Sequence, residues 1–151
     1  MQDLIDEKDK KIIEILQENS SLSTHKISKK TLIPITTVNN RIKKLKKLGV
    51  IKRHTIEIDK SKLGFNLSAY ILITVSLREL KQEGMTTRDL VQILKKNPNA
   101  ESVDNVTGDV DIILKINVRH INELNDYVVN VLSGYKGVEK TQTALILTKN
   151  L

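Results

Sequence analysis

Apolar residues in the segment 35–47 recur with the period of an α-helix. Val38, Ile42 and Leu45 are spaced by four and three positions, which aligns them in one narrow stripe. At about 100° per residue, the opposite side of such a helix holds polar residues, namely Thr36, Asn40, Lys43 and Lys47, flanked by Asn39, Lys44 and Lys46. The pattern predicts a helix that packs through one seam and presents hydroxyl, amide and ammonium groups on its other side.

Two shorter helical patterns precede this segment. Residues 6–17 combine an acidic first turn, which suits the helix dipole, with four apolar residues. Residues 23–30 begin with Ser23, whose hydroxyl can accept a hydrogen bond from the amides of the first turn. A short connection ending in Pro34, a residue that suits the start of a helix, separates this helix from the segment 35–47. Two helices joined so closely predict a helix-turn-helix, whose second helix enters the major groove of DNA.

The end of the long helix marks the end of a first domain. Gly49 can act as its C-terminal cap. Apolar and polar residues alternate weakly after this cap, first at Val50 and Ile51 and then over residues 55–58. This pattern predicts a short wing or hairpin followed by a strand. Residues 59–66 are polar with one glycine, and we expect them to form a linker. We therefore expect a DNA-binding domain over residues 1–58 and a second domain over residues 67–151.

Strand and helix patterns alternate in the second domain. β-Branched and apolar runs predict strands over four segments, namely residues 67–77, 100–107, 110–118 and 141–148. Helices are predicted over residues 88–97, capped by Thr86 or Thr87, and over residues 122–133. We expect the inward residues to be Leu90, Val91 and Leu94 in the first helix and Ile121, Leu124, Val128 and Leu132 in the second.

The order βαββαβ predicts the fold class. It is typical of an α+β, ferredoxin-like domain, in which an antiparallel sheet has both helices on one face. Gly108 and Asp109 supply the turn between the second and third predicted strands, residues 100–107 and 110–118. Apolar residues also alternate on the face that the helices leave open, so we expect this face to pair with another subunit.

Composition narrows the class of protein. The chain has 151 residues, of which 39% are apolar, enough to build the core of one ordinary domain or two small ones. It contains no cysteine, which excludes disulfides and thiolate sites and fits a reducing compartment. No run approaches the roughly 20 apolar residues of a membrane span, and the first residues are charged, unlike a signal peptide. We expect a cytoplasmic protein with no membrane partner.

The excess of basic charge lies in the predicted helix-turn-helix. The formal net charge is +7. Between Asn19 and Ile56 there is no acidic residue, but there are ten basic ones, Lys26, Lys29, Lys30, Arg41, Lys43, Lys44, Lys46, Lys47, Lys52 and Arg53. The other 15 basic residues accompany all 18 acidic residues of the chain. Such a local excess predicts a surface that binds nucleic acid, rather than a generally basic protein.

The residue types on the long helix suit double-stranded DNA. Asparagine can pair bidentately with adenine, lysine can donate to guanine, and threonine can meet either base or backbone. The candidate DNA-binding residues are therefore Thr36, Thr37, Asn39, Asn40, Arg41, Lys43, Lys44 and Lys47. The alternative is a solvated basic face, which is what most lysine-rich helices present.

A basic helix-turn-helix followed by a small βαββαβ domain resembles the Lrp/AsnC family of transcription regulators. The resemblance covers nearly the whole chain. The positions that match the family pattern are Asp9, Ile12, Leu16, Ser23, Ile27, Val38, Arg41, Leu45, Gly49 and residues 106–111. The resemblance implies a homodimer formed through the second domain, often assembled into tetramers or octamers. It also implies binding to pseudo-palindromic DNA.

The resemblance further implies an amino-acid effector, held near a Thr-Gly-x-x-Asp turn at the contact between dimers. The corresponding residues here are Thr107, Gly108, Asp109 and Asp111. Carboxylates at a turn can hold an ammonium group, and the backbone amides of the turn can hold a carboxylate. The alternative is an ordinary hairpin turn, for which Gly-Asp is common, with Asp111 capping a backbone group or facing solvent.

Three residues depart from the family pattern. Leu32 stands where the turn of the helix-turn-helix usually has glycine. Because a β-carbon in a left-handed conformation costs about 1–2 kcal/mol, we expect this turn to be built differently. Pro34 replaces a capping serine, so that Thr36 or water would have to cap the long helix. Val110 replaces an aromatic residue, which would alter an effector pocket that depended on the ring.

Other functions are predicted less well by these patterns. His25, His54 and His120 lie far apart and at no metal-ligand spacing, and there is no phosphate-binding loop or hydrolase motif. We therefore expect no enzyme activity, no cofactor and no metal. A nucleoid-type protein with little sequence preference remains open. So does an amino-acid-sensing subunit that binds no DNA, although the basic head argues against it.

Overall fold

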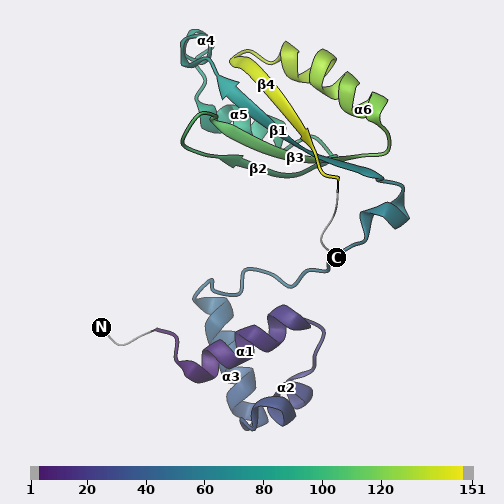
Figure 1. Ribbon diagram of the computed structural model, residues 1–151. Helices are drawn as coiled ribbons and strands as arrows, with labels where there is room; N and C mark the ends of the chain where they lie inside the picture. Colours follow the sequence, from purple (N-terminus) through teal and green to yellow (C-terminus); the bar gives the residue numbers. More distant parts are fainter. Residues whose placement is uncertain (1–3, 148–151) are drawn as a thin grey trace. The chain divides into compact units, whose positions relative to one another are not determined.

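The computed structural model describes residues 4–147, which divide into two compact units (Figure 1). The first unit, the helical head, ends at Ile58, and the second begins at Asp59. Among the described residues, no helix is long and apolar enough to cross a membrane. Each unit has a hydrophobic core of its own.

The head consists of the three expected helices, α1 (Glu7–Glu18), α2 (Thr24–Thr31) and α3 (Ile35–Lys47). Capping residues determine where the first two begin. Asp6 and Asp9 form a reciprocal capping box at the start of α1, and the Ser23 side chain accepts from the Lys26 N–H (3.3 Å) at the start of α2. The apolar faces meet in a small core of Ile12, Ile27, Ile33 and Val38, with Ile42 packed beside it. The predicted helix-turn-helix is confirmed.

The C-terminal end of α3 is closed by two backbone hydrogen bonds. Gly49 has φ +71°, a conformation that glycine adopts without steric cost. Its N–H donates to the Lys46 carbonyl, and the Val50 N–H donates to the Leu45 carbonyl, both at 3.0 Å. This is the Schellman arrangement, which satisfies carbonyl groups that the last helical turn leaves without partners. The predicted helix end is confirmed.

The chain after α3 differs from the prediction. Residues 50–58 form no wing and no strand, and the side chains of Ile56 and Ile58 are 77% and 49% exposed. A strand needs a neighbour to satisfy its amides, and within residues 4–147 no strand pairs with this segment. The expected linker, residues 59–66, contains the 3₁₀ turn η1 (Lys60–Leu63), whose N-terminus is capped by Asp59.

The second unit is built on a four-stranded antiparallel sheet. Its strands are β1 (Leu67–Val75), β2 (Ala100–Asn105), β3 (Ile112–Val118) and β4 (Val138–Leu145). They lie in the order β2-β3-β1-β4, so the two strands at the centre are distant in sequence. The predicted ferredoxin-like topology is confirmed.

Strand boundaries differ from the prediction at both ends of the domain. The first strand ends at Val75 because Ser76 caps a helix that was not predicted, α4 (Leu77–Gln82), by accepting from the Glu79 N–H. The last strand begins at Val138, earlier than expected, and ends at Leu145. Thr148, the expected end of that strand, lies outside the described residues.

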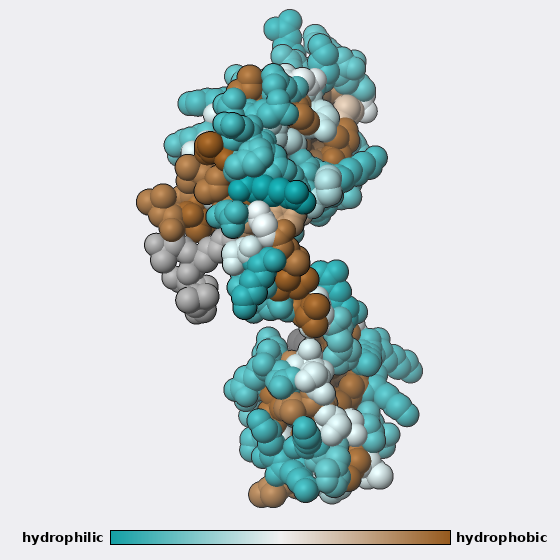
Figure 2. All heavy atoms as spheres, turned by 90° about the vertical axis from the view of Figure 1, so that its right-hand side faces the viewer, coloured by the Kyte–Doolittle hydropathy of each residue, from teal (hydrophilic) through white to brown (hydrophobic). Residues whose placement is uncertain are grey.

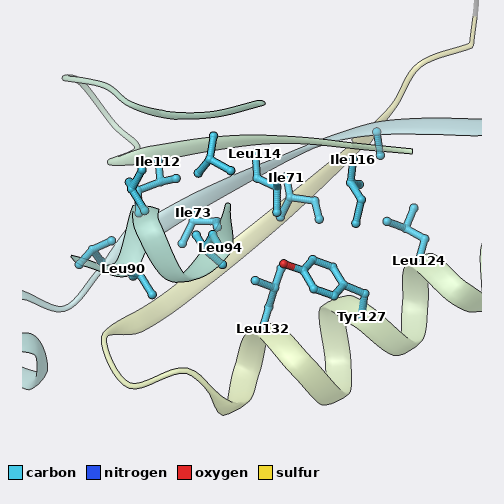
Figure 3. Packing of buried hydrophobic residues seen from close by; sticks show 14 of the residues in the cluster. Ile71, Ile73, Leu90, Leu94, Ile112, Leu114, Ile116, Leu124, Tyr127 and Leu132 are labelled. Atoms are coloured by element: carbon cyan, nitrogen blue, oxygen red, sulfur yellow. The ribbon is translucent and has the colours of Figure 1, made fainter. Parts of the chain in front are cut away.

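The helices cover one face of the sheet. Helix α5 (Thr87–Leu94) starts with a capping box between Thr86 and Asp89 and buries Leu90, Val91 and Leu94. Helix α6 (Ile121–Asp126) continues through a π-helical segment, η2 (Tyr127–Val131), and a 3₁₀ turn, η3 (Leu132–Gly134). Figure 3 shows side chains of both helices meeting those of β1 and β3.

One inward residue was predicted wrongly. Ile121, expected in the core, is 50% exposed, whereas Tyr127 is buried against the sheet together with Leu124 and Leu132 (Figure 3). The reason is local geometry, since Ile121 is the first residue of α6 and follows its capping residue, His120. The first turn of a helix projects beyond the packed face, and its apolar residues do not have to be buried.

Gly137 gives a test of this packing. It has φ +88°, and a β-carbon there would overlap the buried side chain of Leu80 on α4. We expect Gly137→Ala to lower the free energy of unfolding by about 2–4 kcal/mol, from backbone strain and overpacking together. Gly134→Ala is the matched control, because nothing lies within 4 Å of its added carbon. Urea unfolding of both variants would show the difference, and equal stabilities would contradict this packing.

Candidate nucleic-acid interface

Helix α3 separates its apolar and polar sides as the sequence predicted. Val38 and Leu45 are fully buried, and Ile42 is half-buried. On the other side Thr36, Asn39, Asn40, Lys43 and Lys47 are exposed, while Thr37 is half-buried beside the seam. Within residues 4–147, no ion pair involves Lys43 or Lys47. These side chains form a polar face that is accessible from outside the head. The side of the head seen in Figure 2 is mostly hydrophilic.

The turn before α3 was expected to avoid the left-handed conformation, and this expectation is wrong. Leu32 has φ +58°, the only positive φ of a non-glycine residue among those described. The turn is determined by its neighbours, because the Ile33 side chain is buried in the head core and the Ser28 hydroxyl donates to the Ile33 carbonyl (2.6 Å). These contacts outweigh a strain of about 1–2 kcal/mol. The Leu32 side chain itself is 91% exposed.

The N-terminus of α3 has no side-chain cap. Pro34 occupies the capping position and makes no side-chain hydrogen bond, and no described side chain takes its place. Of the two expected replacements, Thr36 or water, Thr36 makes no capping hydrogen bond. Backbone N–H groups in the first turn of α3 are left to water or to a ligand.

Two other cationic residues of α3, Arg41 and Lys44, face α1. The Arg41 Nη1 atom contacts both Asp6 carboxylate oxygens (2.6 and 2.7 Å) and Asp9 Oδ1 (2.8 Å). Lys44 Nζ donates to Asp9 Oδ2 (2.8 Å). The Asp9 side chain is fully buried, whereas those of Arg41 and Lys44 are 21% and 43% exposed. The four side chains form a charge-balanced cluster between the two helices.

Ionisation of the two aspartates follows from these contacts. Burial of the Asp9 carboxyl opposes its ionisation, but hydrogen bonds from Lys44 and Arg41 outweigh the burial, and the pKa of Asp9 is lowered. The hydrogen bond from Arg41 lowers the pKa of Asp6 to about 2, with help from the backbone N–H of Asp9. Both groups are therefore charged at neutral pH, and they neutralise two of the ten local cations.

Sequence reasoning missed this cluster, although it found all four residues. Asp6 and Asp9 were interpreted as an acidic first turn, and Arg41 and Lys44 as candidate DNA contacts, and the two pairs were not connected. Asp9 is separated from Arg41 by 32 positions and from Lys44 by 35. The spacing of residues within one helix or strand cannot predict a contact between residues so far apart in the sequence. The run of basic residues without an acidic one, from residue 19 to residue 56, was the only hint that some of them need acidic partners from outside it.

The candidate effector residues lie in the connection between β2 and β3. Thr107, Gly108 and Asp109 are exposed, and Gly108 has φ +127°. Asp111 differs from them, because its Oδ2 atom accepts from the Val75 N–H (2.8 Å) and its own N–H donates to the Ile73 carbonyl (3.0 Å). The carboxylate of Asp111 therefore closes the end of β1, as the structural alternative anticipated.

The three histidines are not brought together. His120 caps α6 by accepting from the Glu123 N–H at its Nδ1 atom (3.3 Å). His25 is the second residue of α2, and His54 follows α3. Among the described residues, no group of three or more histidine, aspartate or glutamate side chains could hold a metal ion.

The buried Asp9 predicts an acid-sensitive head. Its folded pKa is depressed, so its stabilising contribution is present above the unfolded value of about 4 and is lost as the pH falls through the folded value. We expect Asp9→Asn to cost about 1–3 kcal/mol at pH 7, less than a typical buried pair, because Arg41 keeps Asp6 and Lys44 is partly solvated. Circular dichroism melting should show the gap to wild type narrowing below pH 4.

The matched control for this prediction is Glu7→Gln. Glu7 lies in the same helical turn, but its pair with Lys10 is largely exposed. An exposed pair of this kind contributes little to stability, so the control should melt close to wild type at every pH. A gap between Asp9→Asn and wild type that stays constant from pH 7 to pH 3 would show that Asp9 is not the titrating group.

Two family models match the chain. One is described as a winged helix-turn-helix DNA-binding domain and matches residues 5–52. The other is described as the Lrp/AsnC ligand binding domain and matches residues 68–149. Their order along the chain is that of the head and the βαββαβ unit.

Known proteins resemble the chain over nearly its full length. The HTH-type transcriptional regulator FL11 of Pyrococcus furiosus is 35% identical over 147 residues, which cover 97% of this chain and 92% of that protein. The structure of LrpC of B. subtilis is 28% identical, with a TM-score of 0.81 over 97% of this chain and 96% of that one. The transcriptional regulator NMB0573 of Neisseria meningitidis, solved with L-Met, shares the fold at 23% identity, with a TM-score of 0.87 over 96% of this chain and 91% of that one. This chain belongs to the Lrp/AsnC family of transcriptional regulators.

Proposed function

We propose that α3 enters the major groove of double-stranded DNA and reads sequence through its exposed polar face. The observation that supports this most is the exposed polar face of Thr36, Asn40, Lys43 and Lys47, opposite the seam through which α3 packs. Residues in the first half of a recognition helix reach base edges, and those nearer its end meet the backbone. Asn40 therefore contacts a base, with adenine as its preferred partner, and Lys47 contacts phosphate.

Arg41 and Lys44 have a different role in this proposal. Their charges are balanced by Asp6 and Asp9, so they orient α3 against α1 rather than supply unpaired charge to DNA. Of the ten basic residues between Asn19 and Ile56, eight then remain to neutralise phosphates. Thr37 and Asn39 flank the reading face and contact the backbone.

We further propose that the protein acts as a homodimer in the cytoplasm, and that dimers can assemble into tetramers or octamers. The face of the sheet without helices exposes Tyr70 (41%) and presents Leu72, Ile113 and Ala144 beside it. Burying this face against a second copy removes apolar area from water. A dimer supplies two heads, which suits a pseudo-palindromic site with two half-sites.

An amino-acid effector at the β2–β3 connection is the third part of the proposal. Thr107 and Asp109 offer oxygen atoms to an ammonium group, and the backbone amides around Gly108 offer donors to a carboxylate. Asp111 holds the connection in place through Val75 rather than touching the ligand. The L-Met in the Neisseria meningitidis regulator supports an amino acid as the kind of ligand that this fold accommodates.

The reading face is tested by two substitutions at opposite ends of it. We expect Asn40→Ala to lose discrimination of about 1–3 kcal/mol at one base pair in each half-site. Lys47→Ala should weaken binding to all sequences alike, because a phosphate contact contains no sequence information. The measurement compares Kd for the promoter of the protein's own gene and for random DNA at one fixed salt concentration.

Three results would count against this assignment. Equal losses by Asn40→Ala on specific and random DNA would mean that α3 touches only the backbone. Equal affinity of the wild type for both DNAs would favour a nucleoid-type protein. A Kd that does not change with salt would remove the basic head from the interface, since release of counterions makes phosphate contacts salt-dependent.

The effector site is tested by titrating the common amino acids. A ligand present at 100 times its Kd should stabilise the folded protein by about 2.7 kcal/mol, visible in calorimetry, and light scattering should follow any change in assembly. Asp109→Asn should reduce this gain without altering the ligand-free melting temperature, because Asp109 is exposed. Glu139→Gln, at an exposed position on β4, is the matched control. If no amino acid at millimolar concentration changes mass, melting or DNA affinity, this site does not exist.

A further inference from the structure

Three apolar residues are exposed where the turn of the helix-turn-helix meets α3. Leu32 is 91% exposed, Ile35 is 39% exposed, and Pro34 between them is also exposed. We call these three residues the apolar tip. Ile33, in the middle of the same stretch, points the other way into the head core and is 5% exposed. The apolar tip therefore adds nothing to the core of the head.

The apolar tip is also unfavourable for the isolated head. Leu32 keeps a left-handed backbone that glycine would adopt without strain, and it places its side chain in water. Pro34 leaves the N-terminus of α3 without a side-chain cap. A residue that strains the turn and stabilises nothing within the head is explained if its side chain is used in a complex.

The surroundings of the apolar tip indicate what it contacts. It is continuous along the chain with Thr36, the first residue of the polar reading face. Lys29 and Lys30, both exposed near the end of α2, precede it along the chain with only Thr31 between. Cationic residues around a small apolar surface suit a partner with charged phosphates outside and apolar groups inside, which is the major groove of DNA.

We propose that the apolar tip packs against the 5-methyl groups of thymine in the major groove, and so selects A·T pairs beside the base read by Asn40. Thymine is the only base that presents a methyl group there, and apolar side chains are its usual contacts. The N-terminal part of a recognition helix, where Ile35 lies, is the part that reaches the bases. This inference depends on the proposed role of α3.

The test replaces thymine by deoxyuridine, which keeps its base pairing and lacks only the methyl group. The probe is a duplex selected from a random library by the full-length protein, with its thymines replaced one at a time and Kd measured at fixed salt. Wild type should lose about fourfold in affinity for each contacted methyl group, the value of one buried methylene. In Leu32→Gly or Ile35→Ala, the same replacement should change Kd by less than about 1.5-fold. The side chain that contacts the methyl group is already absent in these variants, so removing the methyl group costs no further affinity.

Two features keep the test from being confused with unfolding. Glycine fits the backbone at position 32, so Leu32→Gly should melt at or above the wild-type temperature. Leu48→Ala is the matched control, because Leu48 is 42% exposed, like Ile35, but lies at the other end of α3. This control should keep the full fourfold dependence on the methyl group.

The outcomes separate this inference from the proposed function. If wild type binds the selected duplex but tolerates deoxyuridine at every position, the inference is wrong and the role of α3 stands. The inference is equally wrong if Leu32→Gly and Ile35→Ala keep the full dependence, since the methyl group then acts through DNA shape or through another residue. If no duplex is selected from the library, both proposals fail.

Discussion

A buried carboxylate has to be neutralised where it lies, and the head of this protein is arranged around that requirement. Asp9 is fully buried between α1 and α3, and two cations of α3 reach it. Removing one partner from such a group leaves a charge that the interior solvates poorly. The orientation of the recognition helix therefore depends on Arg41 and Lys44 remaining on Asp9. Apolar packing along Val38 alone would allow α3 to rotate about its axis more easily.

This requirement divides α3 into three sides with separate tasks. The apolar side packs in the core, the ionic side of Arg41 and Lys44 orients the helix, and the third side has no partner among the described residues of the head. The net charge of a segment therefore overstates what it offers to DNA. In the DNA complex that we propose, base reading falls to Asn40 and its neighbours near the start of the helix, and phosphate binding falls to the lysines that have no acidic partner.

The sheet of the second unit has helices on one face only, and its other face is left without helices. Polar groups occupy part of that uncovered face. Ser68 and Asn117 are almost fully buried there and bond to each other (2.7 Å), and Asn117 also donates to Glu101 (2.8 Å). Hydrogen bonds from Lys115 and Lys60 lower the pKa of Glu101 to about 2. The bond from Lys60 also attaches η1 to the sheet.

The sequence by itself determined much of what depends on neighbours within about one helical turn or one strand alternation, although it missed α4 and its cap at Ser76. Helix seams, the cap at Ser23, the Gly49 stop and the βαββαβ order follow from local spacing, and the order of elements restricts the sheet to few topologies. Only the tertiary structure decided which cations of α3 are paired, because their partners lie more than 30 residues away. It also decided that residues 55–58 form no strand, since alternation predicts a strand only where another strand is available to pair with it. Leu32 shows the same limit, because the contacts on both sides of it impose a backbone conformation that its own side chain disfavours.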